Sequence, residues 1–494
     1  MTLPKIVQQE FDDEEPSFPA PWIPKGWTEE EMARFSDAGN ASALKASETL
    51  AQNVYKQEYT EVKVADVMNP AIPLWDSIML EAQRQVLVDS EKHIPLFACS
   101  VADHILNLHA MASCGVVQFG DPPQIQSNPR CVMKGRKPCL TSVDGAKAAD
   151  LRLFLMVLGS PGSGKSELEK FFVDRSGGVL PQSVVPSQFF QTISRASLFG
   201  SVREDSRHPK VPIMNWGLAY KHCSGILACE EFNFFKASAG AQYNVGMEDS
   251  LLAFAEHGIV EVDFRAGSFN YTVGTTGWFG NQVDRLWLGS GESGLTRRLC
   301  MDFIFMTDEL NARYKEARKV RRRIPPNSQV REYFAKRFKP LIANLHIERI
   351  EPDPDYYTLL KEFDLSSQTS FGGSMAYEEP IFDRIAAGYN LLKYWDPSQT
   401  VLRIRVDDTL KQIIRRQMHI REFFLANGSP VASELILRLQ RAEHSCRKEA
   451  LLREMRRLGG YSPWKVEKEL AGMVKSGRIR MVGNTYDPVV ELNE

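Results

Sequence analysis

The sequence has few of the features that mark disulfide-stabilised, membrane-spanning or secreted proteins. Its eight cysteines include no Cys-x-x-Cys pair, which argues against a disulfide framework and offers no zinc-binding pattern. The longest apolar run, residues 153–158, is ended by Gly159 and falls well short of the roughly 18 residues of a membrane span. The first residues, MTLPKIVQQEFDDEEP, lack the apolar core of a secretory signal. These absences lead us to expect an intracellular, cytoplasmic protein with reduced thiols and no membrane partner.

Net charge is also nearly absent, because 60 basic residues almost balance 62 acidic ones. This balance conceals a polarity along the chain. Residues 1–50 hold ten acidic and four basic residues, whereas residues 432–482 hold six acidic and twelve basic ones, so the two ends suit different partners. The remaining composition, with 43% hydrophobic residues, excludes a wholly disordered or collagen-like chain. At about 150 residues per domain, 494 residues predict roughly three domains.

Hydrophobic periodicity and proline content divide the chain into four parts. Residues 1–75 are acidic and proline-rich, and we expect them to be weakly structured. Residues 76–306 alternate apolar strand candidates (LRLFLMVL, GILACEEF, MDFIFM) with helical segments, a pattern typical of a mainly parallel sheet covered on both faces. A hairpin is predicted between the second and third of these strands. Residues 307–428 are predicted to be largely helical, and residues 429–494 to form a separate small domain.

A complete phosphate-loop pattern follows the first apolar strand and precedes a helix. Its residues are Gly159, Ser160, Pro161, Gly162, Ser163, Gly164, Lys165 and Ser166. Glycines in this pattern let backbone N–H groups turn inward and cradle phosphate oxygens. We expect Lys165 to reach the β- and γ-phosphates of ATP and the Ser166 hydroxyl to ligate Mg²⁺.

Other polar residues complete the chemistry that a phosphate loop requires. Glu230 and Glu231 follow four apolar strand residues, which places them at the edge of the sheet where ligands bind. We expect Glu230 to hold the hydration shell of Mg²⁺ and Glu231 to orient and deprotonate the attacking water. Asn281 is a candidate for positioning that water, and Arg297 or Arg298 could reach the nucleotide of a neighbouring subunit or form a surface salt bridge.

The order of these segments resembles the motor domain of MCM-type helicases, within the AAA+ ATPases. SPGSGKSELEKFF is similar to the phosphate loop and its helix, and the stretch ISRASLFGSVREDSRHPKVPIMNWGLAYKHCSGILACEEF resembles the one that carries the family's helix-2 insert. LLAFAEHGIVEVDFRAG is similar to the family's helix and pre-sensor hairpin, and GLTRRLCMDFIF to its arginine-finger segment. The resemblance covers residues 94–305, with a weaker continuation to the end of the chain.

The resemblance implies an AAA+ P-loop core with a helical lid, assembled as a hexameric ring around DNA. Carried over by position, the phosphate loop, Glu230, Glu231 and Asn281 act within one subunit, and Arg297 or Arg298 acts on the next. Arg265, at the predicted hairpin turn, matches the basic residue that touches the DNA backbone, although an exposed turn arginine has the same sequence pattern. Arg384 is the nearest candidate for the second-sensor arginine. The short polar segment before the motor suggests a minimal relative from a virus or mobile element.

The basic C-terminal part has the pattern of a winged helix. Three helical segments, residues 432–444, 448–459 and 463–477, precede a short hairpin whose turn is Gly483-Asn484. Gly459-Gly460 is expected to end the second segment, and Ser462 to cap the third with Pro463 at its first position. Lys465 and Lys468 on the third helix, with Arg478 and Arg480 on the hairpin, would contact DNA phosphates. A protein-docking domain with solvated charges has the same pattern.

Three functions are compatible with these motifs. The first is an ATP-driven helicase or translocase acting on single-stranded or forked DNA in replication, which would be associated with the nucleoid. The second is a protein-remodelling ATPase similar to the MoxR/RavA group, whose turnover would ignore DNA. The third is an origin-binding or loader protein that uses ATP as an assembly switch.

Overall fold

The computed structural model describes most of the chain after residue 61. The described ranges are 62–113, 117–118, 124–125, 140–142, 148–149, 151–175, 177–192, 194–204, 212–231, 247–264, 267–282, 298–321, 327–343, 345–370, 379–426, 430–483 and 486–493. Ordered structure begins earlier than the expected boundary at residue 75. Helix α3 (Val64–Val67) buries Val67, because it packs onto α4 (Leu74–Arg84) and the main core.

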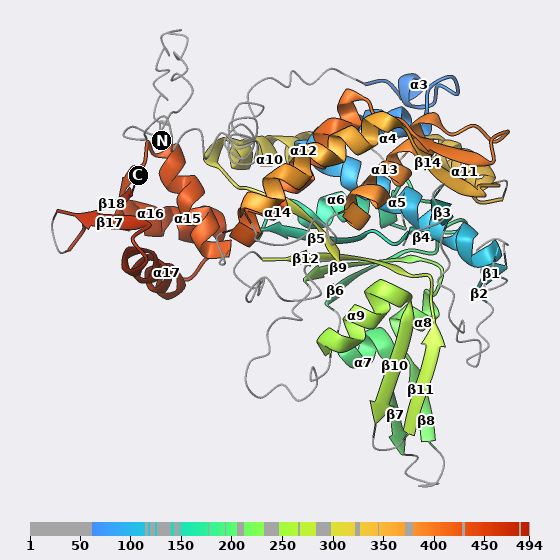
Figure 1. The fold of residues 1–494 in the computed structure, drawn as a ribbon, viewed down its shortest axis with the longest axis horizontal. Helices are drawn as coiled ribbons and strands as arrows, with labels where there is room; N and C mark the ends of the chain where they lie inside the picture. The colour runs from blue at the N-terminus through green and yellow to red at the C-terminus, as the bar shows by residue number, and fades with distance from the viewer. Residues whose placement is uncertain are drawn as a thin grey trace, which may run out of the picture.

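A five-stranded parallel sheet lies at the centre of the molecule (Figure 1). Its strands, in spatial order, are β13 (Leu299–Ile304), β5 (Phe154–Gly159), β12 (Thr276–Asn281), β9 (Ile226–Glu231) and β6 (Gln188–Thr192). All residues of β5, β12 and β13 are buried, which explains why β5 and β13 are mainly apolar runs in the sequence, whereas β12 (TGWFGN) has no such run. The predicted α/β class with a parallel sheet is confirmed.

Helices cover both faces of this sheet, as the alternation of strands and helices predicted. Leu155 and Val157 of β5 point into one apolar core, which they share with α4, α5 (Ser90–Ser113) and α6 (Lys165–Val173). Phe154, Met156 and Leu158 point into the other core, shared with α7 (Arg195–Phe199), α8 (Leu218–Lys221) and α9 (Met247–His257). The period of two along the strand therefore assigns alternate side chains to two separate cores.

Two β-hairpins project side by side from the face of the central sheet that α7, α8 and α9 cover (Figure 1). One pairs β7 (Gly200–Glu204) with β8 (Pro212–Trp216), and the other pairs β10 (Ile259–Phe264) with β11 (Gly267–Thr272). The Tyr271 hydroxyl donates to Phe199 O at 2.8 Å and joins the second hairpin to the base of the first. The second hairpin is the one that the strand pattern predicted, and its turn residue Arg265 lies outside the described residues.

The region after the sheet is mainly helical and belongs to the first core. Its helices are α10 (Asp308–Arg321), α11 (Ser328–Ala343), α12 (Pro354–Ser370), α13 (Glu379–Tyr394) and α14 (Asp408–Ala426). Gly388 of α13 lies so close to α5 that a Cβ would be 2.3 Å from Cys99 O. A small mixed sheet was not predicted: β14 (Arg349–Pro352) and β15 (Val401–Ile404) join β3 (Leu140–Ser142) and β4 (Ala148–Ala149). No described helix is long and apolar enough to cross a bilayer.

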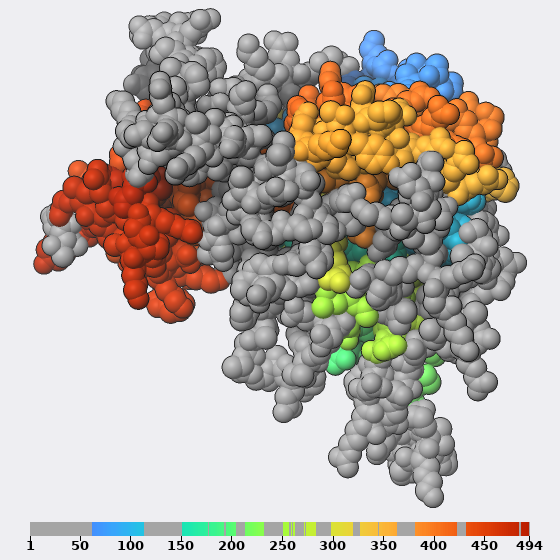
Figure 2. All heavy atoms as spheres, in the orientation of Figure 1, coloured from blue at the N-terminus to red at the C-terminus, as the bar shows by residue number. Residues whose placement is uncertain are grey.

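Residues 430–493, called the C-terminal domain below, form a lobe at one end of the molecule (Figure 2). Its elements are α15 (Pro430–Arg441), β16 (Ser445–Arg447), α16 (Lys448–Glu454), a π-helical turn (Met455–Gly459), α17 (Pro463–Lys475), β17 (Ile479–Val482) and β18 (Val489–Leu492). The three strands form an antiparallel sheet in the order β16-β18-β17. The predicted helices and hairpin are confirmed, including the Ser462 cap that accepts from Lys465 N, whereas β16 was not predicted.

Candidate nucleotide site

The phosphate loop joins β5 to α6 at the carboxyl edge of the sheet. Strand β5 ends at Gly159 and α6 begins at Lys165, so the loop lies where parallel strands end and a helix N-terminus begins. Gly162 has a φ of 79° and Gly164 a φ of 89°, conformations that side chains rarely adopt. The loop therefore needs glycine at both positions, as the sequence pattern indicated.

The two reactive side chains of the loop are held by different partners. Lys165 is buried, and its Nζ donates to Gly159 O at 2.7 Å and Ser160 O at 2.9 Å. The Ser166 hydroxyl donates to Glu230 Oε1, which connects the start of α6 to the end of β9. Ser166 and Glu230, which are 64 residues apart in sequence, are therefore in direct contact, as expected for two groups that serve one cation.

Strand order brings Asn281 between the loop and the two carboxylates. Strand β12 lies between β5 and β9, with Asn281 beside Leu158 and Phe279 beside Cys229. Continuing this register places Asn281 at the level of Glu231, at the same edge as the phosphate loop. Gly280 makes the close approach possible, because a Cβ there would lie 2.4 Å from Glu230 O.

Asn281 has a hydrogen-bonding group with no partner in the described part of the chain. Its Oδ1 accepts from Gln282 N at 2.8 Å, which fixes the orientation of the amide. Its Nδ2 makes no hydrogen bond there, although the residue is only 2% exposed. A buried donor without a partner costs about 1–3 kcal/mol, so such groups are uncommon unless a ligand uses them.

The residues at this edge fit a magnesium ion. Mg²⁺ takes oxygen ligands and keeps several waters, and the Ser166 hydroxyl and the Glu230 carboxylate are two oxygen groups in direct contact. Within the described ranges, no group of three or more His, Cys, Asp or Glu side chains is placed to hold a metal by protein ligands alone. The site therefore suits an ion that retains waters and phosphate oxygens, which is how Mg²⁺ accompanies ATP.

Glu169, one helical turn after Lys165, was not recognised in the sequence. Its side chain is fully buried, and neither of its oxygens has a hydrogen-bond partner among the described residues. Burial raises the pKa of Glu169 well above its ordinary value; Lys165 opposes this rise and Glu230 adds to it. Burial therefore favours the neutral form of this carboxyl at the base of the loop. The i, i+4 spacing from Lys165 was the available signal.

Arg298 lies at the opposite edge of the sheet from the phosphate loop of its own chain. It immediately precedes β13, in which Leu299 pairs with Phe154 and Ile304 pairs with Gly159. Six residue steps therefore separate its level from Gly159 at the start of the loop, about 20 Å at 3.3 Å per residue. At this distance Arg298 cannot reach a nucleotide bound at its own phosphate loop. Arg297 lies outside the described residues, and Arg384 is buried on α13.

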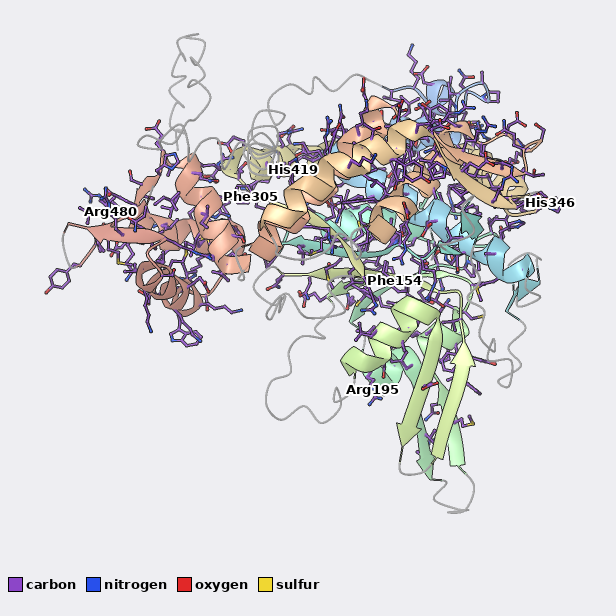
Figure 3. The ribbon with its side chains drawn as sticks, viewed as in Figure 1. Phe154, Arg195, Phe305, His346, His419 and Arg480 are labelled. Atoms are coloured by element: carbon purple, nitrogen blue, oxygen red, sulfur yellow. The ribbon has the colours of Figure 1, made fainter. Side chains whose placement is uncertain are left out.

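Four of the five basic residues expected to contact DNA lie in the C-terminal domain, and the fifth, Arg265, lies outside the described residues. Lys465 and Lys468 are on α17, and Lys468 Nζ lies 5.5 Å from the ring centre of Trp464, which is 69% exposed. Arg478 precedes β17, and Arg480 on β17 pairs with Glu491 of β18 at 2.7 Å. Figure 3 places Arg480 on the side of the domain that faces away from the sheet. The structure thus brings these residues together in one domain, apart from the nucleotide site.

Helix α10 covers the phosphate loop, which sequence reasoning missed. In the sequence, the basic run of residues 313–323 is typical of a solvated helix, although it could also contact nucleic acid. Instead, Arg313 pairs with Asp89 at 2.9 Å, and Arg318 donates to Glu167 at 3.3 Å and to Gly162 O at 3.4 Å. The spacing of the buried Leu310, Tyr314 and Ala317, three or four residues apart, was the signal of a buried face.

Compared with known protein families and with curated proteins, the chain gives no significant match. The argument for its function therefore rests on its own residues and their geometry.

Proposed function

We propose that this chain is an ATP-driven DNA helicase or translocase of the MCM type, an AAA+ ATPase that hydrolyses ATP between subunits of a ring during DNA replication. One observation carries the proposal. The phosphate loop, the Glu230–Glu231 pair and Asn281, which are spread over more than 100 residues, lie at one edge of a single parallel sheet, and Ser166 is bonded to Glu230. This arrangement suits phosphoryl transfer to water.

Each group at this edge has a chemical role in that reaction. Lys165 would exchange the carbonyls of Gly159 and Ser160 for the β- and γ-phosphates. Ser166 and Glu230 would hold Mg²⁺, which supplies positive charge next to the phosphates. Glu231 would accept a proton from the attacking water, and the Asn281 amide would donate to that water or to a γ-phosphate oxygen.

The rest of the molecule offers surfaces for DNA. The paired hairpins project from the core, and the order of elements in the C-terminal domain suits a winged helix in which Lys465, Lys468, Arg478 and Arg480 would contact phosphates. Helices α11–α14 would form the lid. Cations on a hairpin bind the backbone without reading sequence, as translocation requires.

The decisive experiment measures ATP turnover and unwinding of a forked duplex for the wild type, Lys165→Ala and a control. Lys170→Ala is the matched control, because Lys170 is on the same helix but exposed, with its Nζ 4.6 Å from the centre of the Phe189 ring. We expect single-stranded DNA to stimulate turnover, and Lys165→Ala alone to abolish turnover and unwinding. Turnover that ignores DNA would favour a protein-remodelling ATPase, and DNA loading that survives in Glu231→Gln would favour an ATP-switched loader.

The role of Arg298 has a separate test, because it would act on a neighbouring subunit. We expect Arg298→Ala and Lys165→Ala each to lack turnover when assayed alone. A mixture of the two should regain part of the activity, since Lys165→Ala subunits can still offer Arg298 to an intact phosphate loop. No recovery in mixtures that co-assemble would assign Arg298 to the fold of its own subunit.

A further inference from the structure

Two other parts of the chain touch the outer side of the phosphate loop. Helix α10 lies against its second half, where a Cβ on Gly164 would be 2.6 Å from Tyr314 Cε1. The C-terminal domain touches its first half, where a Cβ on Gly460 would be 2.6 Å from Pro161 Cδ. The domain that carries the proposed DNA-binding residues is therefore in direct contact with the loop that would bind ATP.

One end of this interface is a buried anchor. Arg438 of α15 is fully buried, and its guanidinium donates to Glu434, to Glu454 at 2.8 Å and to Met306 O at 3.4 Å. It also lies 4.9 Å from the ring centre of Phe305, just after β13, and Figure 3 shows Phe305 at the junction of core and domain. A buried charge with this many partners is costly to expose, so the anchor holds the domain on the core.

The other end is formed by exposed groups that separate easily. Arg457 of the π-helical turn makes two hydrogen bonds to Asp308 of α10, and Arg441 lies 3.4 Å from Glu309. The side chains of Arg457 and Asp308 are 53% and 59% exposed, so water competes for this pair. The turn ends at Gly460, whose φ of 77° requires glycine and which meets Pro161. Single π-helical turns are frequently found at functional sites.

The loop cannot keep its present hydrogen bonds when it binds ATP. Lys165 Nζ is bonded to the carbonyls of Gly159 and Ser160, the two residues directly before Pro161. A phosphate that draws Lys165 away frees these carbonyls, and the backbone around Pro161 must adjust. Gly460 has no side chain that could change rotamer when Pro161 moves. A small shift of Pro161 therefore changes the contact between Pro161 and the backbone of Gly460.

We propose that the contact of the turn Met455–Gly459 and Gly460 with Pro161 is a nucleotide-responsive restraint. It stabilises the loop conformation in which Lys165 is bonded to the loop's own carbonyls, and ATP binding loosens it while the Arg438 anchor stays closed. The inference rests on the proposed nucleotide site and adds its regulation. The domain then turns about Arg438, and helix α17 and strand β17, which carry the basic residues, move with it.

Linkage makes the effect reciprocal. If ATP loosens the turn contact, then DNA that binds the loosened domain more tightly also raises the affinity for ATP. The factor by which DNA raises the affinity for ATP equals the factor by which ATP raises the affinity for DNA. Stimulation of turnover by DNA then needs no contact between DNA and the nucleotide site. The coupling between the DNA-binding residues and the nucleotide site runs through the contact of Pro161 with Gly460 and through the rigid C-terminal domain.

The test breaks the exposed pairs and measures binding of a non-hydrolysable ATP analogue with Mg²⁺ to the full chain. We expect Arg441→Glu/Arg457→Glu to bind the analogue about three- to tenfold more tightly than the wild type, where tenfold corresponds to about 1.4 kcal/mol. Arg457→Asp/Asp308→Arg re-forms the ion pair with reversed charges and should restore wild-type affinity. The matched control is Arg415→Glu, whose pair with Glu362 has similar exposure, 47% and 51%, but joins α14 to α12.

Hydrogen exchange supplies an independent readout on the wild type. Saturation with the analogue should speed exchange of the backbone amides of residues 455–461 and leave the amides around Arg438 protected. Equal affinity of the wild type and the double variant, or unchanged exchange on saturation, overturns the restraint while leaving the ATPase proposal intact. A wild type that does not bind the analogue at all overturns both proposals.

Discussion

Replacing Asn281 by alanine should separate function from stability at this site. The amide Nδ2 is buried without a partner in the described chain, and Oδ1 accepts one bond, from Gln282 N at 2.8 Å. The substitution loses that bond, about 0.5–1.5 kcal/mol, and removes a buried donor that costs about 1–3 kcal/mol. The free energy of unfolding should therefore stay the same or rise by up to about 2 kcal/mol.

The same substitution should strongly reduce catalysis. Loss of one fixed donor to developing charge typically lowers turnover by about 10²–10³-fold, or about 2.7–4 kcal/mol in the transition state. The variant is thus expected to be at least as stable as the wild type and nearly inactive, a combination found where a residue serves a ligand at the expense of the fold. Urea denaturation and phosphate release measured on one preparation would show both effects.

Asn390 provides the matched control. It is fully buried on α13, and its amide is satisfied by Ala386 O at 2.9 Å, Arg405 O at 3.2 Å and Arg405 N at 2.9 Å. At about 1 kcal/mol per bond, Asn390→Ala should lose roughly 3 kcal/mol of stability and keep its turnover per folded molecule. The reasoning is refuted if Asn281→Ala behaves like Asn390→Ala, losing stability while hydrolysing ATP at the wild-type rate.

Four further substitutions test the electrostatics and packing of the fold. Burial raises the pKa of Glu169, so the folded protein favours the protonated carboxyl and loses stability as the pH rises above the ordinary pKa of 4.5. Glu169→Gln should therefore raise the urea midpoint of unfolding at pH 8 and make that midpoint less dependent on pH. Burial alone would raise the pKa of Asp302, but His93 and Arg416 lower it. Asp302→Asn should therefore lower the free energy of unfolding by about 3–5 kcal/mol at pH 7. In chemical denaturation, the difference in stability between wild type and variant should narrow as the pH falls below 3.8. Gly388→Ala should lower the thermal midpoint by forcing α13 from α5, a cost of about 1–3 kcal/mol, whereas Gly472→Ala, with nothing within 4 Å, should raise it.

The sequence predicted those parts of the fold that local patterns specify. The apolar runs became β5, β9 and β13, and the Ser462 cap, the Pro463 start and the Gly460 end of the second helical segment are all present in the C-terminal domain. The phosphate loop and the acidic pair were predicted because each is a short pattern whose chemistry depends on neighbours in sequence.

Features formed by distant segments were not predicted. Strand β14 pairs with β3, more than 200 residues earlier, and neither strand is long enough to show a clear period of two. The basic residues of α10 looked solvated because their partners are distant in sequence: Asp89 directly precedes α5, and Glu167 lies in α6. A sequence shows which residues carry charge, but the distance between opposite charges depends on the tertiary fold.

The phosphate loop and Arg298, the two parts of the proposed catalytic site, lie at opposite ends of the strands of one sheet. This arrangement has a consequence for assembly. Strand β13 starts next to Arg298 and pairs along its length with β5, which ends in the phosphate loop. Since the strands are rigid, no motion within one chain brings the arginine to its own nucleotide. Under the proposed function, each subunit supplies Arg298 to the phosphate loop of one neighbour and receives Arg298 from the other. Such a heterologous contact repeats from subunit to subunit until the rotation closes the assembly into a ring.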